Sequence, residues 1–109
     1  MAFDTKLADR IRAALGNRKG LTEKKMFGGI GFMLGGNMAC GVHGEPMIVR
    51  LDPKKTDDAL ARPHTRRFDL TGRPMKGWIL VDPAGVEKDA DLSKWVSVGA
   101  TYAESLPPK

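Results

Sequence analysis

Apolar residues recur at intervals of three and four near both ends of the chain, which is the spacing of an amphipathic helix. The first such segment covers residues 4 to 16, where Asp4 or Thr5 can cap the helix and Gly16 can end it. The second covers residues 89 to 105. Its apolar side is formed by Leu92, Trp95, Val96, Gly99, Tyr102, Ala103 and Leu106. Both helices are predicted to pack one face against the rest of the protein.

Between residues 26 and 51 the pattern changes to a period of two, which is typical of strands. Apolar residues alternate in three runs, 30–34, 38–42 and 47–51, and turn-forming residues separate these runs. The pattern predicts an antiparallel meander of three strands. The alternation places Cys40 on the same face as Met38 and Val42. Gly28-Gly29 indicates a bulge or bend inside the first strand.

The sequence of the second half of the chain predicts a short helix and two strands before the last helix. Residues 57–61 suit a short helix with Thr56 as its cap, and residues 62–74 are loop-like, with a short strand at 67–70. The stretch "MKGWILVDP" is the clearest strand, because its apolar centre suits an interior position in a sheet. The predicted order is therefore helix, three strands, short helix, two strands, helix.

More than half of the chain's 13 glycines lie between residues 24 and 46, which raises the question of a phosphate-binding loop. A dinucleotide fingerprint that starts at Gly29 fails at Leu34, where its third glycine belongs, and no Walker sequence occurs. Gly31 and Gly41 instead fall on the face opposite the alternating apolar residues. A face without side chains lets a helix or another chain approach closely. We therefore assign these glycines to sheet geometry.

Length and composition indicate one soluble domain over residues 1–109, with a single two-layer core. No apolar run approaches the roughly 20 residues of a membrane helix, and the N-terminus lacks the apolar block of a secretory signal. Cys40 is the single cysteine, which excludes an internal disulfide and favours a cytoplasmic location. The net charge of +5 favours acidic partners, nucleic acid first among them.

Cys40 and His43 suggest a nucleophile–base pair or a metal site. Positions three apart in a strand point to opposite faces, and Cys40 has apolar neighbours on its own face, so a buried thiol is favoured. One cysteine and two histidines fall short of the four ligands of a structural zinc site. The carboxylate pairs at 57–58 and 89/91 fall at helix starts, where they complement the helix dipole. We expect a protein that is not an enzyme, with no metal and no cofactor.

Basic residues gather between positions 62 and 76, with only Asp69 to oppose them. They could bind phosphates or carboxylates, with Phe68 or Trp78 stacked on a base, or they could be solvated and paired with carboxylates. The candidate anion or nucleic-acid contacts are Arg62, Arg66, Arg67, Arg73 and Lys76. The methionines at 26, 33, 38, 47 and 75 suit either core filling or an adaptable partner-binding face.

Three stretches, "KKMFGGIGFMLGGNMACGV", "ARPHTRRFDLTGRPMKGWILVDPAG" and "LSKWVSVGATYAESLP", resemble the TfoX (Sxy) N-terminal domain family over nearly the whole chain. The most specific parts are "MFGG" at 26–29 and "GRPMKG" at 72–77. The resemblance implies an α+β fold in two layers, with a five-stranded antiparallel sheet and helices packed on one side. The implied order, α-β(3)-α-β(2)-α, agrees with the order predicted from the pattern.

TfoX-type proteins regulate competence genes, acting with the cyclic-AMP receptor protein at its promoters, and usually carry a C-terminal helical domain. Because the chain stops at Lys109, we expect a stand-alone single-domain member. The resemblance implies a non-enzymatic regulatory or adaptor domain that contacts a protein of the transcription machinery or a regulator, and offers no catalytic residues. A homodimer is a second expectation for its contacts. The alternative function is a nucleic-acid-binding module that uses the basic loop of residues 62–76.

Overall fold

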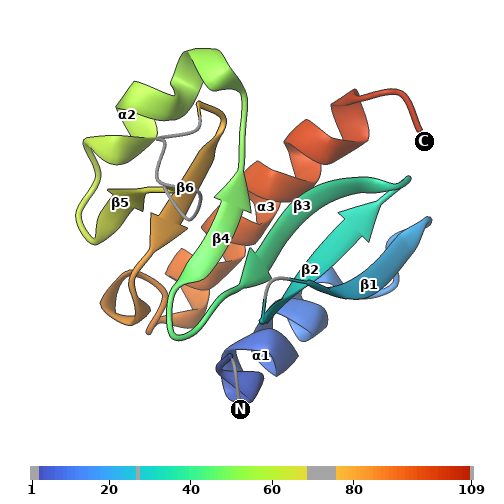
Figure 1. Ribbon diagram of the computed structural model, residues 1–109, viewed down its shortest axis with the longest axis horizontal. Coiled ribbons are helices and arrows are strands. Elements are labelled where there is room, and N and C mark those ends of the chain that lie inside the picture. The colour runs from blue at the N-terminus through green and yellow to red at the C-terminus, as the bar shows by residue number, and fades with distance from the viewer. Residues whose placement is uncertain (1–2, 27, 69–75, 109) are drawn as a thin grey trace.

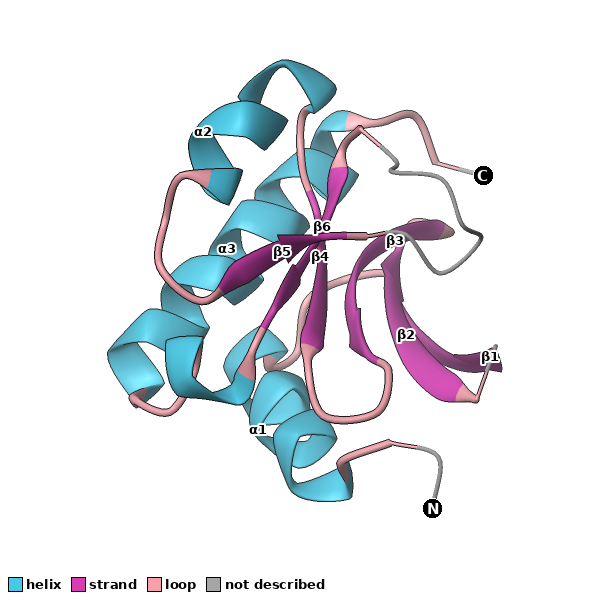
Figure 2. Ribbon diagram, turned by 60° about the vertical axis from the view of Figure 1, so that its left-hand side comes forward, coloured by secondary structure: helices cyan, strands magenta, loops and turns pink. Residues whose placement is uncertain are grey.

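The computed structural model describes residues 3–26, 28–68 and 76–108. Within these residues, six antiparallel strands form one layer and three α-helices form the other (Figures 1 and 2). The helices are α1 (Thr5–Leu15), α2 (Thr56–Leu60) and α3 (Asp89–Ser105), with short 3-10 helices η1 (Pro53–Lys55) and η2 (Pro83–Gly85). The strands are β1 (Leu21–Met26), β2 (Gly29–Leu34), β3 (Asn37–Val42), β4 (Met47–Arg50), β5 (Thr65–Arg67) and β6 (Trp78–Val81).

The strands lie side by side in the order β1-β2-β3-β4-β6-β5. The α+β class and the open antiparallel sheet are confirmed, but the prediction of five strands was wrong. Residues 21–26 form the additional strand, β1, which pairs with β2 and places four strands before α2. Because β1 is an edge strand and carries exposed charged residues, it lacks the apolar alternation that marks the inner strands.

The connection between β1 and β2 corrects a second expectation. Met26 pairs with Gly29, and Gly28 has a φ of 74° between the two strands. Gly28 therefore belongs to a tight reversal of the chain and not to a bulge within one strand. Glycine reaches positive φ without a steric penalty, which is why it suits such a turn.

The two long helices begin and end where the sequence predicts. The Asp4 carboxylate accepts hydrogen bonds from the backbone amides of Lys6 and Leu7, at 3.0 and 3.1 Å, and Gly16 follows the last turn of α1 with a φ of 63°. The helix α3 has the predicted bounds. Its buried positions are Leu92, Trp95, Val96, Gly99, Ala100 and Ala103, whereas the predicted Tyr102 and Leu106 are half-buried.

A bulge in β3 decides which residues face the helices. Phe32 pairs with Cys40 and the next residue of β2, Met33, pairs with Met38, so Ala39 is an extra residue between two registers. Ala39 and Cys40 both join the core under the helices, and Met38 joins a second apolar cluster on the opposite face. The predicted shared face of Met38 and Cys40 was therefore wrong, because the period of two is interrupted at Ala39.

The bulge contacts α3 through Gly99. A Cβ atom placed on Gly99 would lie only 2.2 Å from the carbonyl oxygen of Ala39, far inside van der Waals contact. The helix can approach the sheet this closely only because Gly99 has no side chain. Phe32, Val42 and Val49, which are fully buried, belong to the core cluster that also includes the buried residues of α1 and α3.

The middle of the chain corrects the predicted role of Thr56. Thr56 lies in α2 and is 5% exposed, and its hydroxyl oxygen accepts a hydrogen bond of 2.8 Å from the amide of Gly77. This hydrogen bond connects α2 to the segment that leads into β6. Asp52 caps η1, the 3-10 helix before α2, because its carboxylate accepts a hydrogen bond from the backbone amide of Lys54. The strand predicted at 67–70 overlaps β5 only at Arg67, because β5 begins earlier and Phe68 is not in a strand, while residues 69 and 70 lie outside the described residues.

We predict that Gly99→Ala lowers the free energy of unfolding by about 2–3 kcal/mol, because the added methyl group overlaps the Ala39 carbonyl. Helix propensity alone favours alanine by about 1 kcal/mol and predicts the opposite sign. Urea denaturation followed by circular dichroism measures the difference. Ser97→Ala, at an exposed position of the same helix, is the control and should change stability little. A Gly99→Ala protein as stable as the wild type would contradict the close packing.

Candidate functional site

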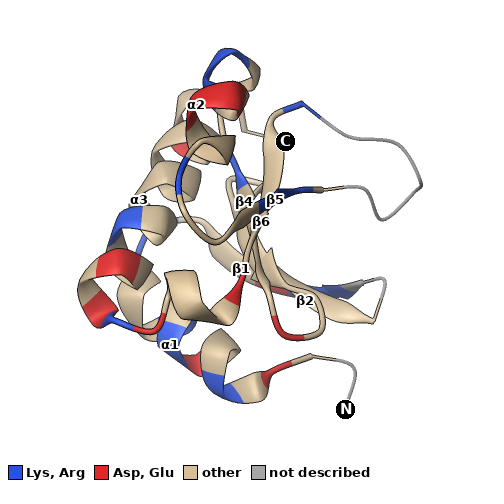
Figure 3. Cartoon of the chain, turned by 90° about the vertical axis from the view of Figure 1, so that its left-hand side faces the viewer, with Lys and Arg blue, Asp and Glu red and all other residues tan. Residues whose placement is uncertain are grey.

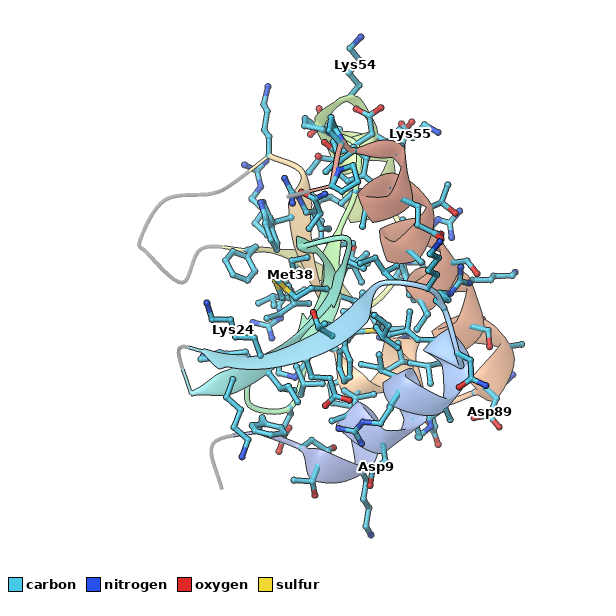
Figure 4. The ribbon with its side chains drawn as sticks, turned by 90° about the vertical axis from the view of Figure 1, so that its right-hand side faces the viewer. Asp9, Lys24, Met38, Lys54, Lys55 and Asp89 are labelled. Carbon is cyan, nitrogen blue, oxygen red and sulfur yellow. The ribbon has the colours of Figure 1, made fainter. Side chains whose placement is uncertain are left out.

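The sheet face opposite the helices, called the outer face here, carries the second apolar cluster. Figure 4 shows Met38 and Lys24 projecting on this side. Ile48 and Leu80 pair across β4 and β6 at its centre and are 6% and 4% exposed. Half-buried side chains surround them. The apolar residues of the outer face are Met33, Met38, Ile48, Phe68, Trp78 and Leu80.

One row of the outer face crosses the whole sheet. Strand pairing places its members opposite one another in the order Lys24, Gly31, Gly41, Ile48, Leu80 and Arg66. The row therefore begins and ends with a basic residue and is apolar or without side chains between them. This arrangement follows from the period of two, which gives neighbouring strands matched faces.

The glycines at the centre of the sheet allow its strands to come close together. A Cβ atom on Gly41 would lie 2.3 Å from the carbonyl oxygen of Ile30 and 2.9 Å from the methyl carbon of Met38. Met38 therefore lies over the position that a side chain at residue 41 would fill. A Cβ atom on Gly29 would lie 2.2 Å from the carbonyl oxygen of Val42. The assignment of these glycines to sheet geometry is confirmed, and Gly31 faces Gly41 inside the sheet.

Arg50 is the functional candidate that sequence analysis missed. Its guanidinium carbon lies 5.2 Å from the ring centre of Trp78, its cross-strand partner, and 5.6 Å from the ring centre of Tyr102 on α3. Both distances suit cation–π attraction. Phe68 lies on the other side of Trp78 in the strand order, with 5.6 Å between the ring centres. The available signal was a basic residue at the end of an otherwise apolar strand.

Arg50 reaches Tyr102 because β3 and β4 separate beside it. The two strands pair only between residues 40–42 and 47–49, and Figure 1 shows them diverging beyond that point with α3 behind them. Arg50 follows the last paired position and is half-buried. Within the described part of the chain, no carboxylate forms an ion pair with it. Among the described residues, its planar donor groups are therefore held in place by aromatic rings and not by an opposite charge.

The predicted basic contacts point in different directions. Arg62 stacks over Trp95, 5.4 Å from the ring centre, beside a shallow pocket of about 380 Å³ that His64 and Lys94 also line. Arg66 forms an ion pair with Asp82, with nitrogen–oxygen distances of 2.7 and 2.9 Å. Because Arg67 is adjacent to Arg66 in β5, its side chain lies on the opposite face.

Lys76 is exposed, and Arg73 lies outside the described residues. Figure 3 shows the basic positions of this region distributed over the β5 edge and the loops around it. The described members therefore do not form one continuous patch. Their contact with nucleic acid stays a prediction.

Cys40 is buried in the core, and burial raises the pKa of its thiol to about 12, while the positive charge of Arg18 opposes the rise. His43 follows β3 and is half-buried. The favoured interpretation of Cys40 as a core thiol is confirmed. Over the described ranges, no group of three or more His, Cys, Asp or Glu residues could hold a metal ion. No helix in the same ranges has the length and apolar character needed to cross a membrane.

We predict that the difference in the free energy of unfolding between the wild type and Cys40→Ala becomes smaller as the pH rises above about 9. The thiol of the unfolded chain ionises near that pH, whereas the buried thiol keeps its proton until about pH 12, so alkaline pH favours the unfolded wild type. The wild type loses at most about 1.4 kcal/mol per pH unit in this window, and Cys40→Ala lacks this loss. Urea denaturation of both proteins at about pH 8 and about pH 10 measures the difference in their free energies of unfolding. If this difference is the same at both pH values, the thiol is not buried in its neutral form.

Comparison with known proteins gives one match. Neither the curated proteins nor the solved structures contain a match to the chain. The family model described as TfoX N-terminal domain matches residues 13–103, from the last turn of α1 to the last turn of α3. The matched region includes every strand of the described sheet and the residues of the outer face. The chain therefore belongs to the TfoX N-terminal domain family.

Proposed function

We propose that this protein is a non-enzymatic regulatory or adaptor domain that acts in transcriptional regulation through contacts with another protein. Membership of the TfoX N-terminal domain family supports a role like that of the competence regulators. The proposal concerns the domain's own contacts and assigns it no catalytic step. Its natural location under this proposal is the cytoplasm, where transcription takes place in bacteria.

The observation that carries the proposal is the apolar cluster of the outer face. The described helices pack on the other face of the sheet, yet the outer face presents half-buried Met33, Phe68 and Trp78 around a buried centre. Neighbouring apolar side chains that stay partly exposed on a sheet face suit an interaction site. Methionine side chains are flexible and polarisable, so Met33 and Met38 suit contact with a protein partner.

The chemistry of the described residues also favours binding over catalysis. A thiol nucleophile must be accessible and ionised, whereas Cys40 is fully buried with a raised pKa. The alternative proposal, nucleic-acid binding by the basic loop, receives less support from the geometry. Arg66 is already paired with Asp82, and Arg62 is stacked on Trp95.

We predict that deleting the gene changes a defined set of transcripts and that wild-type protein restores them. Met33→Glu should fail to restore them, because it places a charge at the rim of the outer face while the residue is only half-buried. Transcript profiling of the complemented strains measures the effect.

Val98→Glu is the matched control, since Val98 is also a half-buried apolar residue but lies on α3, under the opposite face. It should restore the transcripts if its melting curve shows a folded protein. Unaltered transcripts in the deletion strain, or full restoration by Met33→Glu, would reject the proposed function.

A further inference from the structure

We propose, on the basis of the proposed function, that the outer face binds an acidic amphipathic protein segment and that Arg50 receives one of its carboxylates. The apolar side chains of the segment contact the half-buried members of the cluster, Met33, Phe68 and Trp78. Its carboxylates lie against Arg50 and Lys24. The partner in the proposed function is then both acidic and apolar, and Arg50 and Lys24 select it.

The charge of the outer face favours an acidic occupant. Lys24 begins the row across the sheet and Arg50 lies beside its centre, whereas Arg66 at the far end is already paired with Asp82. The outward positions of the described strands carry no carboxylate, and Asp82, which pairs with Arg66, follows the end of β6. The chain as a whole carries +5. A segment with acidic and apolar side chains therefore complements both properties of the face.

Arg50 is held in position for a carboxylate before any partner binds. Trp78 and Tyr102 restrict the guanidinium from two sides, so little side-chain freedom remains to be lost on binding. A guanidinium presents parallel N–H donors that match the two oxygens of a carboxylate. The apolar surroundings strengthen such a pair relative to one in open water.

A second copy of the chain fits the face less well. Face-to-face pairing of two copies brings two sets of Lys24 and Arg50 together, and each copy adds a charge of +5. Like charges across an interface disfavour association. An acidic partner removes this repulsion and therefore fits the face better than a second copy.

Nucleic acid also fits less well, because the aromatic rings are already occupied. Trp78 has Arg50 toward β4 and Phe68 toward β5, at the distances given above, so its ring already has a neighbour on each side. Single-stranded nucleic acid binds by stacking bases on free aromatic rings along a basic groove. Among the described residues, both aromatic rings of the outer face, Phe68 and Trp78, already have an aromatic or cationic neighbour.

The size of the cluster sets the length of the segment. The cluster extends from Met33 on β2 to Phe68 beyond β5, which is four strand spacings or about 19 Å. A helix that covers this distance needs about 13 residues. A synthetic peptide of about 16 residues is therefore long enough to test the face.

The experiment compares two synthetic helical peptides by fluorescence anisotropy against the full chain. Both carry leucine and methionine on one side; one has glutamate along the flanks of that side, and the other has lysine at the same places. We expect the glutamate peptide to bind at least about tenfold more tightly than the lysine peptide. Its affinity should fall when the salt concentration is raised from about 50 to about 300 mM.

Matched variants then locate the site. Arg50→Gln and Lys24→Gln should each weaken binding of the glutamate peptide, the first by about tenfold. Lys6→Gln removes the same charge from the exposed side of α1 and should leave the affinity within about twofold of the wild type. If Arg50→Gln is unfolded by its melting curve, Lys24→Gln against Lys6→Gln gives the decisive comparison.

The inference would be overturned by equal binding of the two peptides, by equal effects of Lys6→Gln and the outer-face variants, or by Arg50-dependent binding of an oligothymidylate of about 20 nucleotides in place of the peptide. Light scattering that shows a dimer dissociated by Met33→Glu would also overturn it in favour of a second copy. If the peptide fails to bind but Met33→Glu still fails to restore transcripts, the inference is rejected and the proposed function stands.

Discussion

The contact between Gly99 of α3 and the bulged residue Ala39 of β3 is the constraint on which the rest of the structure depends. The bulge turns Ala39 and Cys40 toward the helices together, and only a residue without a side chain lets α3 pack against the Ala39 carbonyl. The same extra residue turns Met38 to the other side of the sheet. One backbone irregularity therefore supplies both the close helix packing and part of the outer face.

The outer face depends on this geometry at two further points. Gly41 leaves room for Met38 to lie along the sheet, so the methionine fills a depression and does not stand out as a separate side chain. The short pairing of β3 with β4 leaves space for Arg50 to reach between Trp78 and Tyr102. A cation held by aromatic rings beside apolar residues can select a partner that is apolar and acidic at once.

Sequence analysis predicted the elements that local chemistry determines. The bounds of α1 follow from the Asp4 cap and Gly16, which act within one turn of the helix. Strand β1 was missed because an exposed edge strand has no need of apolar alternation. The bulge was missed because apolar residues continue on both sides of Ala39. The role of Arg50 depends on Trp78 and Tyr102, which are distant in sequence, whereas Arg62 and Arg66 are close in sequence and take separate partners.

The orientation of Met38 tests this account most directly, because both the bulge and the outer face require it. Nuclear Overhauser contacts of the Met38 methyl group, measured on methyl-labelled protein, report which face the side chain occupies. The account predicts contacts with the α-protons of Gly41 and with Ile48 or Leu80. Contacts with Val42, Val96 or other residues under the helices would show an unbroken period of two in β3 and would contradict it.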